Sequence, residues 1–453
     1  MSELTDVFTG MASAIRSKTG SSSAFTPAQM ITEIENIPTG GGGSWVGVSA
    51  YASSSITSYT GNENLILDNA FMSCSSLTEV SFPECEYIGA QAFGSCSNLT
   101  TVSFPKCSYI GDSAFNTCNN LSQAILPTCS YIGGSAFNNC TNLTTISFPN
   151  ISYINDYTFN NCNNLSQAIF PNVSYIGGSA FRGCTNLTTA SFPNCSYISV
   201  GAFGGCASLI NISFPECSYI GSNAFTGCTS LATASFPNVS YIGGNAFRSC
   251  TNLTNISFPN CSYIGGTFLN GGGFTGCNNL SQAIFPTCSY IGDEAFRSCT
   301  NLTAASFPEC SYIGSNAFRD CSSLTTASFP NCSYIDGTRY MGGGFTGCTN
   351  LTNISFPTCS YIGDEAFKGC TNLTTASFPE CSYIGNNAFW SCSRLSQLYL
   401  LSKSVVSLAG TPAFLDSPLS NGGSGKIYVP SSLYNKYKSA TNWSYLSARI
   451  ASM

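Results

Sequence analysis

The chain repeats a unit of 22 residues fourteen times, and this period constrains the fold more than any other feature of the sequence. The units share the form C-x-x-L-x-x-x-x-F-P-x-C-x-Y-I-G-x-x-A-F, and two steps of 27 residues contain extra Gly-rich segments. One unit cannot bury its own apolar face, so the units are predicted to stack into a solenoid. With Leu126 filling one slot, the Phe-Pro pairs begin at Phe82, Phe104, Phe148, Phe170, Phe192, Phe214, Phe236, Phe258, Phe285, Phe307, Phe329, Phe356 and Phe378.

Each unit contains two candidate strands and one candidate turn. In residues 99–105, apolar Leu99, Val102 and Phe104 are separated by Thr and Ser, which favours an extended strand that Pro ends. The segment Cys-Ser-Tyr-Ile-Gly supplies a second short extended piece. The segment Ala-Phe-x-x-Cys is too short for a stable helix and is predicted to form a helical turn.

This pattern resembles the leucine-rich repeat family, in particular its BspA-like type, over about residues 65–400. The resemblance implies a curved solenoid with a parallel sheet on its concave face. The expected fold class is a β-rich leucine-rich-repeat solenoid with short helical turns, a small helical N-terminal module and an α+β C-terminal cap. The predicted boundaries are a helical hairpin at 1–38, a Gly-rich linker at 39–44, a capping coil at 45–72, the solenoid at 73–400 and a C-terminal cap at 401–453.

The two ends of the chain differ from the repeat. Residues 1–38 have apolar residues at helical spacing and a second helix start at Thr26, followed by Pro27 and Gln29. This segment resembles tail-associated proteins of bacteriophages and prophages from gut Firmicutes, which implies docking onto a larger virion or surface assembly. At the other end, residues 426–450 predict a strand, a short helix capped by Ser431 or Ser432, and a second helix from Trp443.

Twenty-six cysteines lie between Cys74 and Cys392 in two columns, one after Phe-Pro-x and one after Ala-Phe. Ile151, Val173 and Val239 replace the first column while the second keeps its Cys in those units, so small buried apolar positions with reduced thiols are predicted. Disulfides between stacked coils remain an alternative, because like cysteines of neighbouring coils are expected near the ~5 Å Cα separation that a disulfide needs. No His and no zinc-type Cys spacing are present, so no metal is expected.

A tyrosine precedes Ile in every repeat and is expected at or near the surface, because Ile is the predicted core residue. One interpretation is an aromatic ladder that seals the solenoid. The other is a stripe of rings that stacks on sugars or on the apolar face of another protein. The candidate ligand-binding residues in this column are Tyr219, Tyr241, Tyr263, Tyr312 and Tyr334.

Two further features are candidates for binding. Outward strand positions such as Thr100, Ser103 and Asn255 form either a solvated sheet face or a face that hydrogen-bonds hydroxyl groups. The insertions at 263–274 and 334–345 contain the candidate residues Phe268, Arg339 and Tyr340. Insertions in solenoids map to loops on one face, often the binding face, and harmless loop extension is the alternative.

Composition narrows the function. Only 8% of residues are charged and the net charge is −6, without a basic stripe, so no nucleic-acid partner is expected. No membrane insertion, signal peptide, cofactor or catalysis is expected, because the required segments and residue clusters are missing. The leading hypothesis is a non-catalytic phage-tail or cell-surface protein, in the virion or at the extracellular surface, that recognises a bacterial surface polysaccharide or protein. The alternative is a structural spacer or self-assembling fibre, with homo-oligomers possible.

Overall fold

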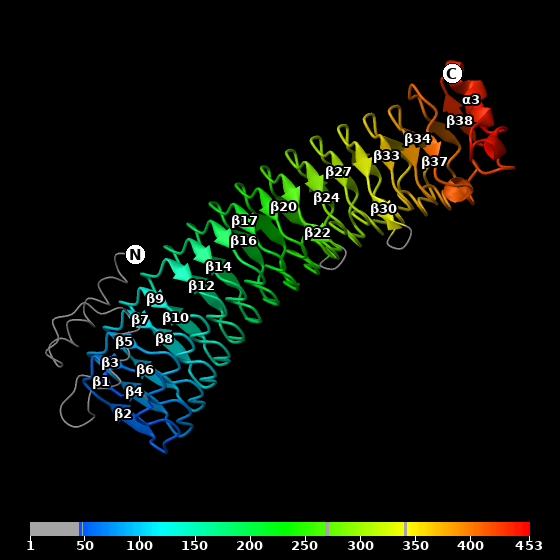
Figure 1. Ribbon diagram of the computed structural model, residues 1–453. Helices are drawn as coiled ribbons and strands as arrows, with labels where there is room; N and C mark the ends of the chain where they lie inside the picture. Colours follow the sequence, from blue (N-terminus) through cyan, green and yellow to red (C-terminus); the bar gives the residue numbers. More distant parts are fainter. Residues whose placement is uncertain (1–44, 48, 268–270, 339–341) are drawn as a thin grey trace, which may run out of the picture. The chain divides into compact units, whose positions relative to one another are not determined.

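The computed structural model describes residues 45–47, 49–267, 271–338 and 342–453. Its contacts divide the chain into two compact units, residues 1–195 and 196–453. Within each unit consecutive coils stack in chain order, and each coil contributes two short strands (Figure 1). Each unit is therefore a parallel β-solenoid. The predicted docking module at 1–38 and the linker at 39–44 lie outside the described residues.

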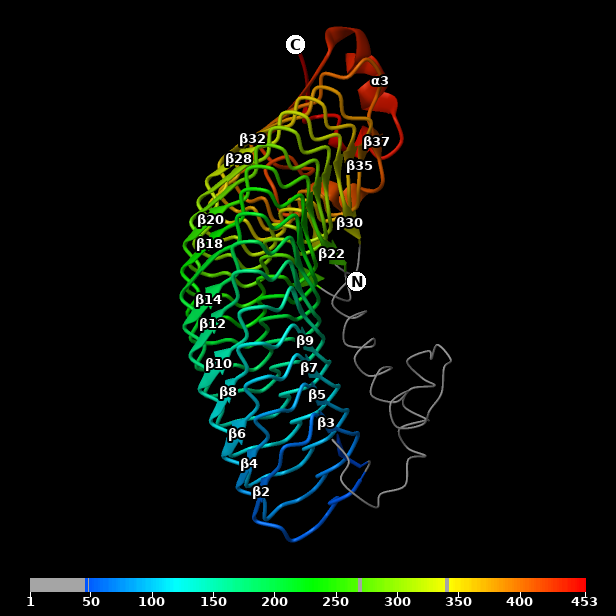
Figure 2. The same ribbon diagram turned by 90° about the vertical axis from the view of Figure 1, so that its left-hand side faces the viewer.

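The first unit contains a row of three-residue strands and a row of two-residue strands. The three-residue strands are β2 Ser58–Thr60, β4 Glu79–Ser81, β6 Thr101–Ser103, β8 Gln123–Ile125, β10 Thr145–Ser147, β12 Gln167–Ile169 and β14 Thr189–Ser191. The two-residue strands are β1 Trp45–Val46, β3 Leu65–Ile66, β5 Tyr87–Ile88, β7 Tyr109–Ile110, β9 Tyr131–Ile132, β11 Tyr153–Ile154 and β13 Tyr175–Ile176. In Figure 2 the two rows lie on opposite sides of the unit.

The second unit continues the same plan. Its longer strands are β16 Asn211–Ser213, β18 Thr233–Ser235, β20 Asn255–Ser257, β24 Gln282–Ile284, β26 Ala304–Ser306, β28 Thr326–Ser328, β32 Asn353–Ser355, β34 Thr375–Ser377, β36 Gln397–Tyr399, β38 Lys426–Val429 and β39 Ile450–Ser452. Its two-residue strands are β15 Tyr197–Ile198, β17 Tyr219–Ile220, β19 Tyr241–Ile242, β21 Tyr263–Ile264, β25 Tyr290–Ile291, β27 Tyr312–Ile313, β29 Tyr334–Ile335, β33 Tyr361–Ile362, β35 Tyr383–Ile384 and β37 Ser407–Leu408. The insertions add the hairpins β22 Gly266–Thr267 with β23 Gly271–Gly272, and β30 Gly337–Thr338 with β31 Gly342–Gly343.

The parallel sheets predicted from the repeat are confirmed. Strands of successive coils pair in register, so that Tyr219 faces Tyr241 and Ile220 faces Ile242. An exact period of one coil places identical residues next to each other in neighbouring strands. This register turns each column of the sequence into a row on the molecule.

The core consists of the apolar columns. Leu99, Phe104, Cys107, Ile110 and Phe115 represent one coil, and each is almost fully buried. The phenylalanines after Ala stack from coil to coil, as in the pair Phe93 and Phe115, whose ring centres lie 5.2 Å apart with the planes 4° from parallel. Such stacked pairs contribute about 0.5–1.5 kcal/mol beyond the area that they bury.

The helical turn predicted for Ala-Phe-x-x-Cys is wrong. Ser113 and Thr117 have φ values of 57° and 62°, in the left-handed region, which a right-handed helix excludes. The backbone N–H groups of Ser113, Phe115 and Thr117 donate instead to carbonyls of the next coil, at 2.7–2.8 Å. The segment is a chain of turns whose alternate amides link neighbouring coils.

The C-terminal segment combines strands with short helices. The strand predicted here is β38, and the short helix is α3, Tyr434–Ser439. Ser431 and Ser432 do not cap α3, because they lie in a 3₁₀ turn, Ser431–Leu433, and the residue that precedes α3 is Leu433. The predicted second helix is only a 3₁₀ turn, Ser444–Leu446, and another 3₁₀ turn spans Thr411–Phe414. That this segment acts as a cap stays a prediction.

Candidate functional site

The longer strands of the second unit present an uncharged polar face. In β28, β32 and β34 the first and third residues point outward and are Thr, Ser or Asn, while the middle residue points inward. The middle residues Ile354 and Ala376 are buried at 4% and 0% exposure. This alternation is the consequence of the two-residue period of a strand. The face therefore offers rows of hydroxyl and amide groups.

A groove crosses this face. Its volume is about 810 Å³, and its polar lining comes from Ser328, Asn353, Ser355, Thr375 and Ser377. Its apolar lining comes from Ala327, Phe329, Pro330, Ile354 and Pro357, and Tyr399 contributes its ring from β36. No lining residue carries a charge. The groove is thus open and neutral, and its hydroxyl and amide groups lie among apolar side chains.

Tyr399 forms one end of the groove. In the register of β34, β36 and β38 its neighbours are Ser377 on one side and Tyr428 on the other. Its ring stacks on Tyr428 with centres 4.8 Å apart and planes 12° from parallel, and its hydroxyl donates to Gln397 Oε1 at 3.2 Å. The side facing the small Ser377 has no aromatic neighbour of this kind, so one ring face borders the groove.

Sequence reasoning missed Tyr399. Its unit ends in Leu-Tyr-Leu-Leu, where the other units have Ser-Phe-Pro or Ile-Phe-Pro, so it was not aligned with the outward serines. The available signal was the third strand position, where Tyr399 and Tyr428 replace Ser in successive strands.

The tyrosine column forms the stacking ladder that the repeat predicts. In the second unit the ring centres of consecutive tyrosines lie 4.3–5.4 Å apart, with planes 1–11° from parallel. Tyr219, Tyr241 and Tyr263 are consecutive members of the ladder, and Tyr312 stacks on Tyr334. An inner ring has both faces covered, so a ligand reaches only its edge and hydroxyl. Ligand binding by these tyrosines stays a prediction.

Burial and a hydrogen bond affect two hydroxyls of the ladder, those of Tyr290 and Tyr312. The Tyr312 hydroxyl donates to Asp336 Oδ2 at 2.9 Å. Burial, and then this hydrogen bond to a carboxylate, raise the pKa of Tyr312 well above its usual value. Burial raises the pKa of Tyr290, between the two candidate groups, to about 12. These phenols stay neutral in the physiological range.

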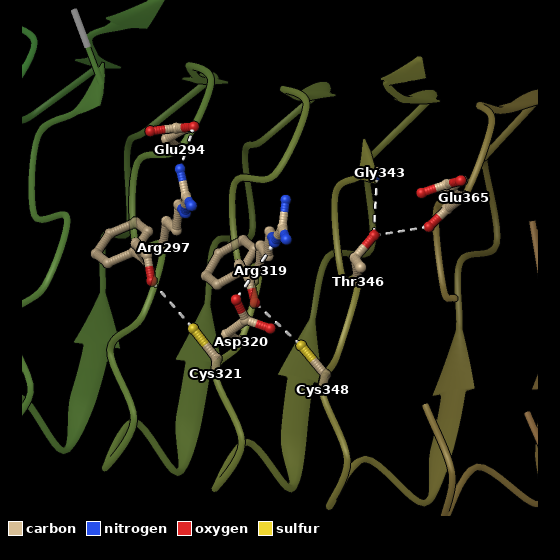
Figure 3. A network of polar contacts seen from close by, with 11 residues as sticks. Glu294, Arg297, Arg319, Asp320, Cys321, Gly343, Thr346, Cys348 and Glu365 are labelled. Atoms are coloured by element: carbon tan, nitrogen blue, oxygen red, sulfur yellow. Dashed lines mark hydrogen bonds and ion pairs between the residues drawn. The ribbon is translucent and has the colours of Figure 1, made fainter. Parts of the chain in front are cut away.

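The two insertions are built alike, 71 residues apart in the sequence, and both hairpins lie on the same side of the second unit (Figure 1). In the second insertion Thr346 Oγ1 accepts from Gly343 N at 3.0 Å and donates to the Glu365 carbonyl at 2.9 Å (Figure 3). Thr275 Oγ1 donates in the same way to the Glu294 carbonyl at 2.8 Å. The arms are therefore fixed to the next coil. The candidates Phe268, Arg339 and Tyr340 lie outside the described residues.

Charged side chains beside the hairpins are largely paired. Arg297 contacts Glu294 at 2.7 Å, Lys368 contacts Glu365 at 3.1 Å, and Arg319 contacts Asp320 at 3.3 Å. Figure 3 shows the first and third of these pairs on adjacent coils. Partly exposed pairs of this kind contribute about 0–1 kcal/mol each.

All 26 cysteines are buried, and none forms a disulfide. In the column after Ala-Phe the thiol donates to a Phe carbonyl of the preceding coil, as Cys321 does to Phe296 at 3.1 Å and Cys348 to Phe318 at 3.2 Å (Figure 3). In the column after Phe-Pro-x the thiol donates within its own coil, as Cys310 does to the Tyr312 carbonyl. These contacts explain why Cys, a small apolar residue with a weak donor, suits both columns.

Burial also makes the thiols unreactive. It raises the pKa of Cys228 to about 12 and that of Cys321 well above the ordinary thiol value. Thiolate, the reactive form, is therefore suppressed. Within the described ranges, no three His, Cys, Asp or Glu side chains gather as a metal site.

The fold and its repeat define a parallel β-solenoid of the leucine-rich repeat class. The BspA type leucine-rich repeat region matches the chain over residues 64–188, 152–272, 267–396 and 342–440, and the chain belongs to this family. A leucine-rich repeat protein from Bacteroides ovatus is 24% identical, with a TM-score of 0.53, over 86% of this chain and 87% of its own. A leucine rich cell surface protein from Faecalibacterium prausnitzii is 22% identical, with a TM-score of 0.41, over 79% and 91%.

No curated protein matches the chain. In the part of the chain that the structure describes, no helix has the length and apolar character needed to cross a bilayer.

Proposed function

We propose that this chain is a non-catalytic binding protein that recognises a polysaccharide or protein on a bacterial surface, and that the groove over β28, β32, β34 and β36 binds a neutral glycan. The observation that carries the proposal is the groove itself: an open, uncharged surface in which Ser, Thr and Asn lie among apolar side chains and which ends at the ring of Tyr399.

The chemistry of the groove matches a sugar chain. Hydroxyl and amide groups both donate and accept hydrogen bonds, as sugar hydroxyls do. The C–H face of a pyranose is apolar and packs on an aromatic ring, the task for which Tyr offers rigid area at low entropic cost. Neighbouring strands are about 4.7–4.9 Å apart, close to the length of one sugar residue, so successive hydroxyls of a glycan meet successive strands.

The remaining parts of the proposal follow from composition and family. Repeat proteins of this family present extended surfaces, and the chain contains no His for general acid–base chemistry. We propose that residues 1–38 mount the chain on a phage tail or a cell-surface assembly, as their resemblance to tail-associated segments suggests. A virion or extracellular location is part of the same proposal.

The test measures binding of the full chain to neutral oligosaccharides on an array and then in solution. Tyr399→Ala should weaken binding at the groove by about 1–2 kcal/mol, or about 5- to 30-fold, because the stacking surface is removed. Tyr399→Phe should bind like the wild type, because the ring remains. Tyr241→Ala is the matched control, since it removes a ladder ring remote in sequence from the groove.

The two alanine variants distinguish the groove from the tyrosine ladder as the binding site. Loss of binding in Tyr241→Ala with full binding in Tyr399→Ala would move the site to the ladder tyrosines Tyr219, Tyr241, Tyr263, Tyr312 and Tyr334. Unchanged binding in both variants would contradict a role for either surface.

A structural spacer or self-assembling fibre is the second candidate function. Among the described strands, β39 pairs with β38 alone, and its other edge is free to accept a strand. Sedimentation over a range of protein concentrations distinguishes the two functions. A chain that stays monomeric favours the binding protein, and ordered growth that Ala451→Pro abolishes favours the fibre.

A further inference from the structure

One coil of the first unit departs from the repeat at three neighbouring positions. Residues 109–115 read Tyr-Ile-Gly-Asp-Ser-Ala-Phe, whereas residues 153–159 read Tyr-Ile-Asn-Asp-Tyr-Thr-Phe. Asn155, Tyr157 and Thr158 thus replace Gly, Ser and Ala. The rest of the coil keeps the common form, including Phe159 and Cys162, apart from Ile151 in place of the Cys that follows Phe-Pro-x.

Asn155 changes how this coil packs on the preceding one. At the equivalent glycines a side chain would collide with backbone, since a Cβ on Gly133 would lie 2.5 Å from Asp112 N and one on Gly177 would lie 2.6 Å from Asn155 C. Gly133 donates its backbone N–H to the Ile110 carbonyl at 2.8 Å. At Asn155 the side-chain Nδ2 donates to the Ile132 carbonyl at 2.6 Å.

The sheet of two-residue strands is interrupted at this coil. Among the strands that the structure describes, β9 is the last of the order β1-β3-β5-β7-β9, and β11 pairs with β13 only. The Asn155 amide rebuilds one hydrogen bond across the gap. Thr158, which is fully buried, adds a second polar contact by donating to the Asn155 carbonyl at 2.8 Å. The interruption is therefore hydrogen-bonded and specific, and not a loss of structure.

The interruption also opens the tyrosine ladder. Tyr109 and Tyr131 stack at 4.7 Å with planes 8° from parallel. Tyr153, next along the column, is 57% exposed and meets Tyr175 at 6.0 Å with planes 45° apart. Tyr157 is 47% exposed and has a φ of 58°, a left-handed conformation that is unfavourable for a bulky residue. The same left-handed φ recurs at this position in other coils, as at Ser113, so this coil differs in the bulk of the side chain at Tyr157 and not in its backbone.

The surroundings of these rings are neutral. Between residues 131 and 178 Asp156 is the only charged residue, and its Oδ1 accepts from Gly178 N at 2.6 Å. Hydroxyl and amide side chains make up the rest of the polar surface in this stretch. Exposed rings with polar, uncharged neighbours suit a ligand that has an apolar face and many hydroxyl groups.

We propose that residues 153–157 form a second glycan-binding site, in which the exposed rings of Tyr153 and Tyr157 stack on pyranose rings of a neutral glycan. The ligand class rests on the proposed function, but the site is separate from the groove in the second unit. A glycan site at Tyr153 and Tyr157 accounts for the absence, in this coil, of the glycine that lets neighbouring coils approach closely.

The chain supplies its own control for this site. The triple variant Asn155→Gly, Tyr157→Ser, Thr158→Ala converts the coil to the form found at residues 109–115. In the full chain this variant should restore the stacked ladder and raise hydrogen-exchange protection in this coil. The same change should remove one of the two proposed sites, so that the number of neutral oligosaccharides bound per chain falls from two to one. Tyr153→Ala, which needs no repacking of the coil, should lower this number in the same way.

A footprint locates the contact directly. Acetylation of tyrosine by N-acetylimidazole, read by mass spectrometry, should modify Tyr153 and Tyr157 in the free protein, and a bound oligosaccharide should protect both. Two oligosaccharides bound per chain in both variants, together with no protection, would overturn the site. If Tyr399→Ala then abolishes binding, the proposed function stands without it. A wild type that binds none of the neutral oligosaccharides overturns both proposals.

Discussion

The glycine after Tyr-Ile permits the close approach of coils, and the adjacent Gly133 and Gly134 allow this cause to be tested. A Cβ on Gly133 would lie 2.5 Å from Asp112 N and 2.6 Å from Gly111 C, so neither backbone can give way cheaply. For Gly134 the nearest atom to an added Cβ is the Asp156 carbonyl oxygen at 3.4 Å, an ordinary contact. Gly133→Ala should therefore force two coils apart, and Gly134→Ala should fit.

The magnitude follows from the contacts that separate. Gly133 loses its hydrogen bond to the Ile110 carbonyl, β7 and β9 part, and Tyr131 leaves the stack with Tyr109. Two backbone hydrogen bonds at about 0.5–1.5 kcal/mol each, and one stacked pair at a similar value, give a loss of about 1.5–4.5 kcal/mol. Gly134→Ala should instead be neutral or stabilise by about 0.4–1 kcal/mol, because Ala restricts the unfolded chain.

Hydrogen exchange is the appropriate assay, because long repeat arrays do not unfold as one cooperative unit. The free energy of opening is measured from the amides of residues 107–135 in the wild type and in both variants. The reasoning predicts that protection falls only in Gly133→Ala. Equal protection in both variants would refute the steric explanation of the glycine column.

Two further predictions concern the buried thiols. Unfolded, unreduced protein should titrate 26 free thiols, whereas the native protein should react slowly with the same reagent; a count well below 26 would instead indicate disulfides. Stability should also fall at alkaline pH: burial holds the pKa of Cys228 at about 12, whereas an unfolded thiol ionises near pH 8.5. The stabilisation by each neutral buried thiol is complete below about pH 8.5 and is lost as pH rises toward 12. Over this range the free energy of unfolding falls by about 1.4 kcal/mol per pH unit for each such thiol. Urea unfolding midpoints that stay constant from pH 8 to pH 10 would contradict this prediction.

The parallel solenoid was predictable from the sequence because a period of fixed length leaves few other ways to bury the apolar columns. Once coils stack in register, each column becomes a row, and the stacked tyrosines and buried cysteines follow. What the period does not encode is the backbone between the columns. Ser113 and Thr117 adopt left-handed φ values. A helical interpretation of the Ala-Phe segment does not account for the Ser, Asn and Gly residues that occur at these two positions of the repeat.

The candidate site was less predictable for a related reason. The columns predict binding by residues that every unit shares, such as Tyr241. The groove instead ends at Tyr399, in a unit that lacks the Phe-Pro pair. Ser431 and Ser432 show the same limit at the C-terminal end, where residues outside the repeat form a 3₁₀ turn in place of a cap. In both cases the structure depends on neighbours in space that no repeat supplies.

A uniform solenoid has a consequence for recognition. Identical coils present the same groups at every step, so a ligand bound to the regular part of one unit gains nothing by choosing one position over the next. Specific placement requires coils that differ from their neighbours, and the two glycan sites proposed for this chain are such coils. Tyr399 stands where most coils have Ser, and Asn155 stands where most have Gly. Binding should therefore be far more sensitive to Tyr153, Tyr157 and Tyr399 than to any ring of the regular ladder.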